Sequence, residues 1–226
     1  MMELTIKDRL LLDQMPVLAV PPESKLGRLN KNGQRLLIGA NGIFIEIRRD
    51  WLYAVRRCGG LHGMLQTPFG TVTECTELAG QTIPRRLVNS FIEEARRVSP
   101  LEIGGIITYD IERGEWALRM NRSVSASPTS LRYELPDLRA NEHRVVDLHS
   151  HGEGQAFLSS KDKLDTRGTT AVVMVAGKVS DAALEVIAYL YLNGMPEPIP
   201  WSGGGDIDAA TSEKTDEYEL DEAALD

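Results

Sequence analysis

The sequence contains little cysteine, no long hydrophobic run and no excess of basic residues. Its 226 residues include two cysteines, Cys58 and Cys75, which form no Cys-x-x-Cys pair. We interpret them as two reduced thiols of a cytoplasmic protein, and a single disulfide bridge between them is the alternative. No apolar run approaches the ~18 residues that a membrane-spanning helix needs.

The first residues also lack the features of an export signal. Met1 to Gln14 alternate charged residues with leucine and contain no continuous apolar stretch followed by small residues. Hydrophobic residues make up 42% of the chain, which suffices for a proper core. We therefore expect a soluble cytoplasmic protein of one or two domains, with no membrane partner.

The net charge of −8 is concentrated near the C-terminus. Residues 203–226 carry nine acidic residues and one basic residue, which leaves 24 of each kind in residues 1–202. A neutral body gives no support for direct binding to nucleic acid or anionic membranes, since both require a net cationic face. We predict a disordered acidic tail. The alternative is a docking or self-inhibiting peptide that uses Tyr218, Leu220 and Leu225.

Residues 1–80 read as a strand-rich region of unknown role. The dipeptide Asn41-Gly42 predicts a hairpin turn between strands at 35–40 and 43–47, because both turn residues tolerate positive φ. A further strand is expected at 51–55. His62 stands in a glycine-rich loop without a partner at ligand spacing, so we expect it to face solvent.

The pattern changes to a helical period at Thr82. Apolar residues recur every three to four positions up to Val98, which predicts one amphipathic helix closed by Pro100. Thr82 is the expected N-cap, with Pro84 in the first turn. Strands are expected at 102–109 and 116–120.

The rest of the chain alternates between a polar connection and buried strands. Residues 121–142 suggest a long surface connection, and strands are expected at 144–151 and 171–175. Residues 182–192 are apolar nearly throughout and fit either a strand or a helix. We expect the globular part to end at three prolines, Pro196, Pro198 and Pro200.

His149 and His151 are the first residues that suggest chemistry. Side chains alternate between the faces of a strand, so both imidazoles project from one face and can present two nitrogen ligands to one ion. By itself the pair is weak evidence, and half-exposed histidines at a strand end are the alternative.

Asp162 adds a third ligand of suitable type. The run Ser159-x-x-Asp162 predicts a helix start with Ser159 as N-cap, which would hold the carboxylate rigidly. Two imidazoles and one carboxylate match the three protein ligands of catalytic zinc sites, whose fourth position holds a water acidified to a pKa of about 7. Calcium and magnesium prefer oxygen ligands. A hydrolase also needs a proton carrier, and Glu102 is our candidate, although its position alone does not favour it over Glu93 or Glu94.

Together these residues resemble the JAMM signature of the JAB1/MPN/Mov34 metalloproteases, over about residues 81–200. The resemblance rests on Glu102-Ile-Gly-Gly, His149-Ser-His151 and the run from Ala156 to Asp162. It implies an α/β fold of the JAB1/MPN, cytidine-deaminase-like type, a mixed sheet flanked by helices, over 81–202. It further implies zinc ligands at His149, His151 and Asp162, a general acid/base at Glu102, and an oxyanion donor at Ser159.

Within this family the sequence is similar to protein A of the bacterial PRTRC cassette. The resemblance implies a zinc-dependent peptidase or isopeptidase with a ubiquitin-like protein or conjugate as substrate, and a ThiF-like (E1-like) protein as a further partner. One departure is Gly152, where the family usually has proline; we expect glycine to loosen this loop. The alternatives are a scaffold that has lost catalysis and a DNA-associated protein like the RadC branch.

Three further residues that could bind a metal or orient a ligand lie near the signature. Asp147 lies on the strand face of His149 and could orient its imidazole, although a contact with another element fits better. Asp165 is a rival ligand by type, but a helix turn would carry it away from the metal. His143 is expected to be exposed.

Overall fold

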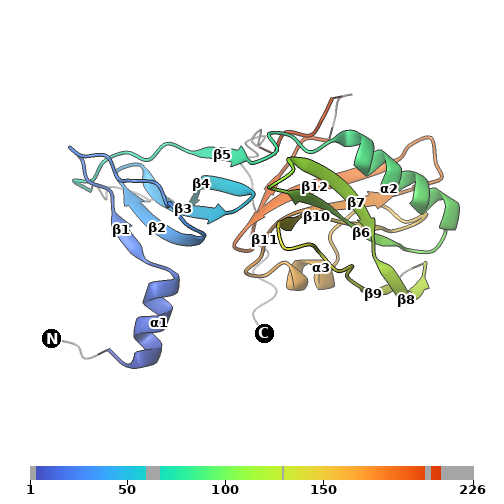
Figure 1. Cartoon of the computed structure of the whole chain (residues 1–226), viewed down its shortest axis with the longest axis horizontal. Coiled ribbons are helices and arrows are strands. Elements are labelled where there is room, and N and C mark those ends of the chain that lie inside the picture. Colours follow the sequence, from blue (N-terminus) through green and yellow to red (C-terminus); the bar gives the residue numbers. More distant parts are fainter. Residues whose placement is uncertain (1–3, 60–66, 129, 202–204, 210–226) are drawn as a thin grey trace.

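The computed structural model describes residues 4–59, 67–128, 130–201 and 205–209, and in this part the chain forms two sheets, a separate hairpin and three helices. Figure 1 shows the two sheets side by side. The first sheet has the order β1-β2-β3-β4-β5, and its strands are β1 (Val17–Ala19), β2 (Gly33–Gly39), β3 (Gly42–Arg49), β4 (Leu52–Gly59) and β5 (Cys75–Leu78).

The second sheet has the order β13-β12-β11-β10-β6-β7. Its strands are β6 (Gly104–Asp110), β7 (Glu115–Met120), β10 (Glu142–Ser150), β11 (Thr170–Gly177), β12 (Glu185–Leu192) and β13 (Met195–Pro198). The remaining elements are the hairpin β8 (Arg122–Ser127) and β9 (Ser130–Glu134), and the helices α1 (Ile6–Gln14), α2 (Arg85–Val98) and α3 (Ser160–Asp165). No helix of the described part combines the length and the apolar character that crossing a membrane would require.

The predicted hairpin of the first sheet is confirmed, but its turn lies one residue earlier than expected. Gly39 pairs with Gly42, so Ala40 and Asn41 form the turn, and Gly42 supplies the positive φ of 140°. The Asn41 amide bonds both backbone groups of Val72 instead. Helix α1 was not predicted; Thr5 and Asp8 form a capping box at its start, and none of its residues is buried.

The second sheet is mixed, because β10 and β11 run parallel and all other neighbours run antiparallel. Residues 185–192 are a strand, which decides between the two predictions for this segment. Helix α2 confirms the amphipathic pattern: it buries Phe91 and its apolar neighbours, and the ring lies against Gly105, where a Cβ would come within 3.2 Å of it. The mixed α/β architecture is thus confirmed.

The two sheets share one hydrophobic core. Ile47 and Trp51 of the first sheet region belong to the same cluster as Phe91, Val145 and Leu192 of the second region. Buried ion-pair partners also join the regions, since Arg56 Nε lies 2.7 Å from Glu197 Oε2. The described residues of the first sheet therefore pack as part of the same folded body as the second sheet.

The start of α2 corrects two predictions. Pro84, not Thr82, is the N-cap residue, and it offers no side-chain hydrogen bond to the helix. Asp206 fills this role: its Oδ1 accepts the Arg85 N–H at 3.0 Å. Ile207 is buried and exchanges two backbone hydrogen bonds with Ile83, both 2.9 Å long. Residues 205–209 of the predicted disordered tail therefore belong to the fold, whereas 210–226 lie outside the described residues.

Three smaller predictions have different outcomes. Most described residues of the connection 121–142 are exposed, as predicted, but the segment also contains the hairpin β8–β9, which Ser127 and Ser130 close. His143 is only 27% exposed, and its Nδ1 lies 3.8 Å from Asp50 Oδ2. His62 lies outside the described residues. The prediction of free thiols at Cys58 and Cys75 is confirmed.

Candidate metal centre and cleft

His149 and His151 lie where the central strand β10 ends. His149 pairs with Val175 of β11 and Gly104 of β6, and His151 follows the strand, its N–H donating to the Ala176 carbonyl at 2.8 Å. The two rings approach to 5.1 Å between centroids, as the alternation of side chains along a strand predicts. The core of the sheet thus holds both imidazoles in place.

Ser150, between the two histidines, connects this strand to Glu102. Its N–H donates to the Ile103 carbonyl at 2.9 Å, and its buried hydroxyl accepts the Ile103 N–H at 3.1 Å. Glu102 therefore stands directly ahead of β6 and beside the end of β10.

Asp162 reaches the same place from helix α3. Ser159 is the N-cap, as predicted, and the two residues form a capping box. Asp162 Oδ2 accepts the Ser159 N–H at 2.8 Å and the Ser159 hydroxyl at 2.6 Å. The cap holds the carboxylate at a defined position facing His149.

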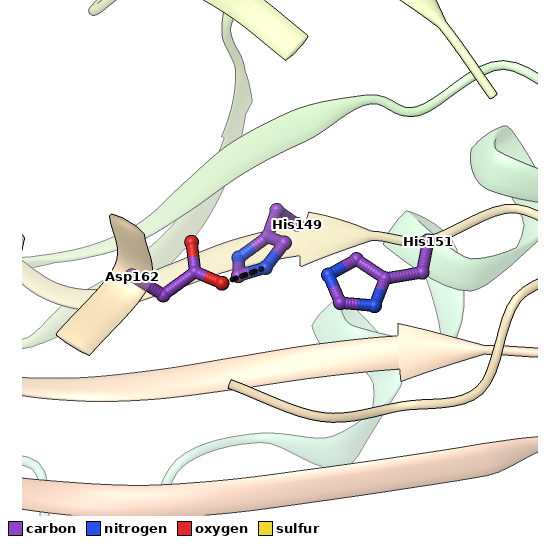
Figure 2. Close-up of side chains that lie close together, drawn as sticks. All are labelled: His149, His151 and Asp162. Atoms are coloured by element: carbon purple, nitrogen blue, oxygen red, sulfur yellow. Dashed lines mark ion pairs between the residues drawn. The ribbon is translucent and has the colours of Figure 1, made fainter. Parts of the chain in front are cut away.

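His149, His151 and Asp162 form the one group of potential ligands found among the described residues. Their ligand atoms all lie within 4.8 Å of one another, and Figure 2 shows the three side chains together, with a dashed line between His149 and Asp162. His149 Nε2 is 3.5 Å from Asp162 Oδ2, and this buried nitrogen has no hydrogen-bond partner. Burying an unpaired polar atom is costly, so it marks a position where a ligand fits.

The other ring is held in one tautomer. His151 Nδ1 lies 2.9 Å from the Gln155 carbonyl oxygen, which can only accept a hydrogen bond, so Nδ1 carries the proton. Nε2 of His151 then presents a lone pair. A hydrogen bond donated by the ring nitrogen that does not bind the metal is typical of metal-ligating histidines.

The two carboxyl groups of the site differ in their electrostatics. Burial raises the pKa of Asp162, but the His149 imidazole 3.5 Å away and the hydrogen bonds from Ser159 lower it more strongly, and the net pKa lies well below its usual range. Burial raises the pKa of Glu102; the imidazoles of His151 and His149 lower it in part, and the Asp162 carboxylate raises it again. The Asp162 carboxylate therefore stays ionised at neutral pH, while the Glu102 carboxyl group takes up a proton more readily than Asp162 does.

These residues lie in a cleft of about 340 Å³. Hairpin β8–β9 contributes Leu131 and Tyr133 to its wall, and the loop before α3 contributes Phe157, whose ring stands edge-on to His151 at 4.7 Å. The full lining is Glu102, Pro128, Ser130, Leu131, Tyr133, His149, His151, Gly154, Phe157, Ser159, Lys161, Asp162 and Asp165. All five sequence-predicted site residues face this one cleft.

Gly152 does not loosen its loop, contrary to our expectation. Its φ is +54°, which proline cannot adopt, and a Cβ would come within 2.3 Å of the Pro100 carbonyl oxygen. Its own carbonyl accepts the Val179 N–H at 3.0 Å. Glycine is required here because the backbone turns left-handed against another segment.

The acidic residues near the ligand group make different contacts from Asp162. Asp147 pairs with Arg144 of the same strand at 3.2 Å, so the predicted contact with another element stays a prediction. Asp165 lines the cleft but does not belong to the ligand group. Glu93 and Glu94 form ion pairs within α2, with Arg96 and Arg97 respectively.

Sequence reasoning missed the apolar wall of the cleft. Leu131 and Tyr133 belong to no motif, and their spacing of two residues along one strand was the available signal. Phe157 lies in the signature run from Ala156 to Asp162, but no role was predicted for it. Lys161 of the cleft and Glu185, which contacts the loop before α3, were also missed.

Comparisons with known proteins divide the chain in two. Residues 84–189 match the family model described as prokaryotic homologs of the JAB domain, and residues 5–79 match one described as a domain of unknown function, DUF2016. The first match supports the JAB/MPN family for that part of the chain. No curated protein matches. Among solved structures, protein DSY2949 of Desulfitobacterium hafniense is 13% identical, with a TM-score of 0.38 over 52% of this chain and 88% of its own.

Proposed function

We propose that the JAB-like domain of residues 84–189 is a zinc-dependent peptidase or isopeptidase that hydrolyses an amide bond at the C-terminus of a ubiquitin-like partner. The observation that carries the proposal is the buried, unpartnered Nε2 of His149, which faces Asp162 and His151 inside a cleft. The choice of substrate and of a PRTRC-type cassette with a ThiF-like protein rests on the sequence resemblance.

The donor set supports zinc among the divalent ions. His149 and His151 offer nitrogen, and Asp162 offers a carboxylate oxygen that is ionised over the whole working pH range. Three protein ligands of this kind leave one position open, as in catalytic zinc sites, while calcium and magnesium favour oxygen. When bound, zinc lowers the pKa of a water from 15.7 to about 7 and polarises the carbonyl group.

Glu102 is the proposed carrier of the proton. It lies in the cleft with both imidazoles, and burial raises its pKa toward the range in which a carboxylate takes up and releases protons efficiently. It would accept a proton from the attacking water and donate it to the leaving amine.

Ser159 is the proposed donor to the oxyanion. Its hydroxyl lines the cleft and here donates to Asp162 Oδ2 at 2.6 Å. The role requires this proton to turn from the carboxylate to the substrate oxygen. Ser159→Ala keeps the backbone N–H that also bonds Asp162 but removes the hydroxyl that caps α3, so zinc content is measured together with turnover. With zinc content unchanged, we expect turnover to fall by about 10²- to 10³-fold.

Metal content tests the first half of the proposal. We expect about one zinc ion per chain in the wild type and none in the double variant His149→Ala/His151→Ala. His143→Ala is the matched control, because His143 lies on the same strand and contacts Asp50 instead of the cleft. A wild-type protein that stays metal-free after purification with zinc contradicts the proposed enzymatic function and favours the alternative of a non-catalytic scaffold.

Turnover tests the second half. The substrate is a ubiquitin-like protein that carries a fluorescent amine on its C-terminal carboxyl group through an amide bond. Release of the amine by the zinc-loaded wild type, and not by the double variant, supports the proposal. Binding of duplex DNA in a salt-sensitive manner, without amide hydrolysis, would favour the RadC-like alternative.

A further inference from the structure

Backbone hydrogen bonds hold the loop between β10 and α3 across the end of β11. The Lys178 N–H donates to the Gly154 carbonyl at 2.7 Å, and the Gly154 N–H donates to the His151 carbonyl at 2.8 Å. A Cβ on Gly177 would come within 2.3 Å of the Ala156 nitrogen, so this crossing requires glycine. We call residues 152–156 the strap.

One peptide group of the strap orients the His151 ring. The carbonyl oxygen of Gln155 accepts the hydrogen bond from His151 Nδ1 at 2.9 Å. The N–H of the same peptide group belongs to Ala156 and donates to Glu185 Oε2 at 3.0 Å. A trans peptide is planar, and its N–H and C=O point in opposite directions. Holding the N–H on one side therefore directs the carbonyl oxygen on the other.

Glu185 is well placed for this task. It begins β12 and pairs with Gly177 of β11, the residue over which the strap crosses. Its second carboxylate oxygen bonds Lys178 Nζ. The hydrogen bonds from Lys178 and Ala156 lower the pKa of Glu185, so the carboxylate stays charged.

We propose that Glu185 is a positioning residue for the metal ligand His151, acting through the peptide group between Gln155 and Ala156. The role in metal binding rests on the proposed function, whereas the orientation of the ring does not. Glu185 touches neither the ligand group nor the cleft in this structure. A hydrogen bond that orients a ligating imidazole typically contributes about 10- to 100-fold to metal affinity, and its loss at one remove is expected at the lower end.

Three variants test the proposal. Glu185→Ala removes the acceptor for the Ala156 N–H, Glu185→Gln keeps an amide oxygen that can accept it, and Lys178→Met removes only the ion pair. Zinc affinity is measured by competition with a chromophoric chelator, with zinc alone as the ligand. We expect about 10-fold weaker binding in Glu185→Ala. The other two variants should stay within about threefold of the wild type.

A metal-free measurement keeps the two proposals separable. The nitrogen chemical shifts of the His151 ring report whether Nδ1 alone carries the proton; we expect this state in the wild type and Glu185→Gln, and a tautomer mixture in Glu185→Ala. A wild type that binds no zinc contradicts the proposed function, and the ring shifts still decide the role of Glu185. Unchanged zinc affinity and ring shifts in Glu185→Ala overturn the inference. Equal losses in the Ala and Gln variants would also overturn it, since charge would then matter instead of the hydrogen bond.

Discussion

The buried polar groups at the two ends of strand β10 differ in their hydrogen bonding. They are paired at the start of the strand, which we call the paired end, and one is unpaired where the strand ends, which we call the open end. At its start, Glu142 is buried and fully paired: Arg119 Nη2 donates to it at 2.8 Å, Thr108 donates from the neighbouring strand, and the Arg139 N–H donates at 3.2 Å. At its end, His149 Nε2 is buried and has no hydrogen-bond partner. Seven residues separate the two, or roughly 23 Å along an extended strand.

This difference separates stability from binding. A satisfied buried charge fixes the fold, and removing one partner leaves the other unpaired. A buried ligand atom without a partner destabilises the fold, and a bound metal ion removes this destabilisation. Asp50, between β3 and β4 of the first sheet, contacts His143 at the start of β10, and no described residue of 1–80 lines the cleft.

The largest effect is expected at the open end, from Glu102→Gln. The change removes the proton carrier but none of the three ligand side chains. We expect turnover to fall by about 10²- to 10⁴-fold while the zinc content stays at wild-type level. Single-turnover amide hydrolysis and metal analysis on the same samples check this. Glu93→Gln, on the exposed face of α2, is the control with expected wild-type turnover; normal turnover of Glu102→Gln would show that the proton carrier is assigned wrongly.

The paired end is tested by Glu142→Ala. It leaves Arg119 and the Thr108 hydroxyl without their buried acceptor. We expect the free energy of unfolding to fall by about 3 kcal/mol with no change in zinc affinity. Denaturant unfolding and chelator competition measure the two quantities. If zinc affinity fell with stability in the folded variant, the two ends of β10 would not be independent.

Acid should weaken the hydrogen bonding of Glu142. The hydrogen bond from Arg119 lowers the pKa of Glu142 from 4.5 to about 2, with burial opposing and Thr108 assisting. A carboxyl whose folded pKa is depressed stabilises the fold above pH 4.5, and this contribution is lost as the pH falls toward 2. We expect about 3 kcal/mol of pH-dependent stability that Glu142→Gln lacks. Equal slopes of unfolding free energy against pH in both proteins would contradict the assignment.

The smallest effect is expected at the start of α2. Asp206→Ala removes the carboxylate that accepts the Arg85 N–H, and a lost N-cap typically costs about 1 kcal/mol. Thermal unfolding measures the change. A chain that ends at Ala209 keeps this cap and should unfold like the full-length protein; a large loss there would show that residues 210–226 do more than solvate the chain.

Short-range rules explain which parts of the site the sequence predicted. His149 and His151 share a face because side chains alternate along a strand, and Ser159 and Asp162 meet because a capping box spans three residues. The turn at Asn41 was misplaced by one residue, and Thr82 was wrongly chosen as a cap. In both places a distant residue takes part: the Asn41 side chain bonds the backbone of Val72, and the Asp206 carboxylate accepts the Arg85 N–H.

The amino-acid sequence by itself determined the local elements: the amphipathic period of α2, the paired histidines and the capped carboxylate. Only the tertiary structure decided that His149 Nε2 has no partner, that the hairpin β8–β9 walls the cleft, and that Glu185 holds the strap. These facts join residues far apart in the chain, 29 positions for Glu185 and Ala156 and 121 for Arg85 and Asp206. Local propensity extends over a few residues, whereas such contacts depend on how the whole core packs.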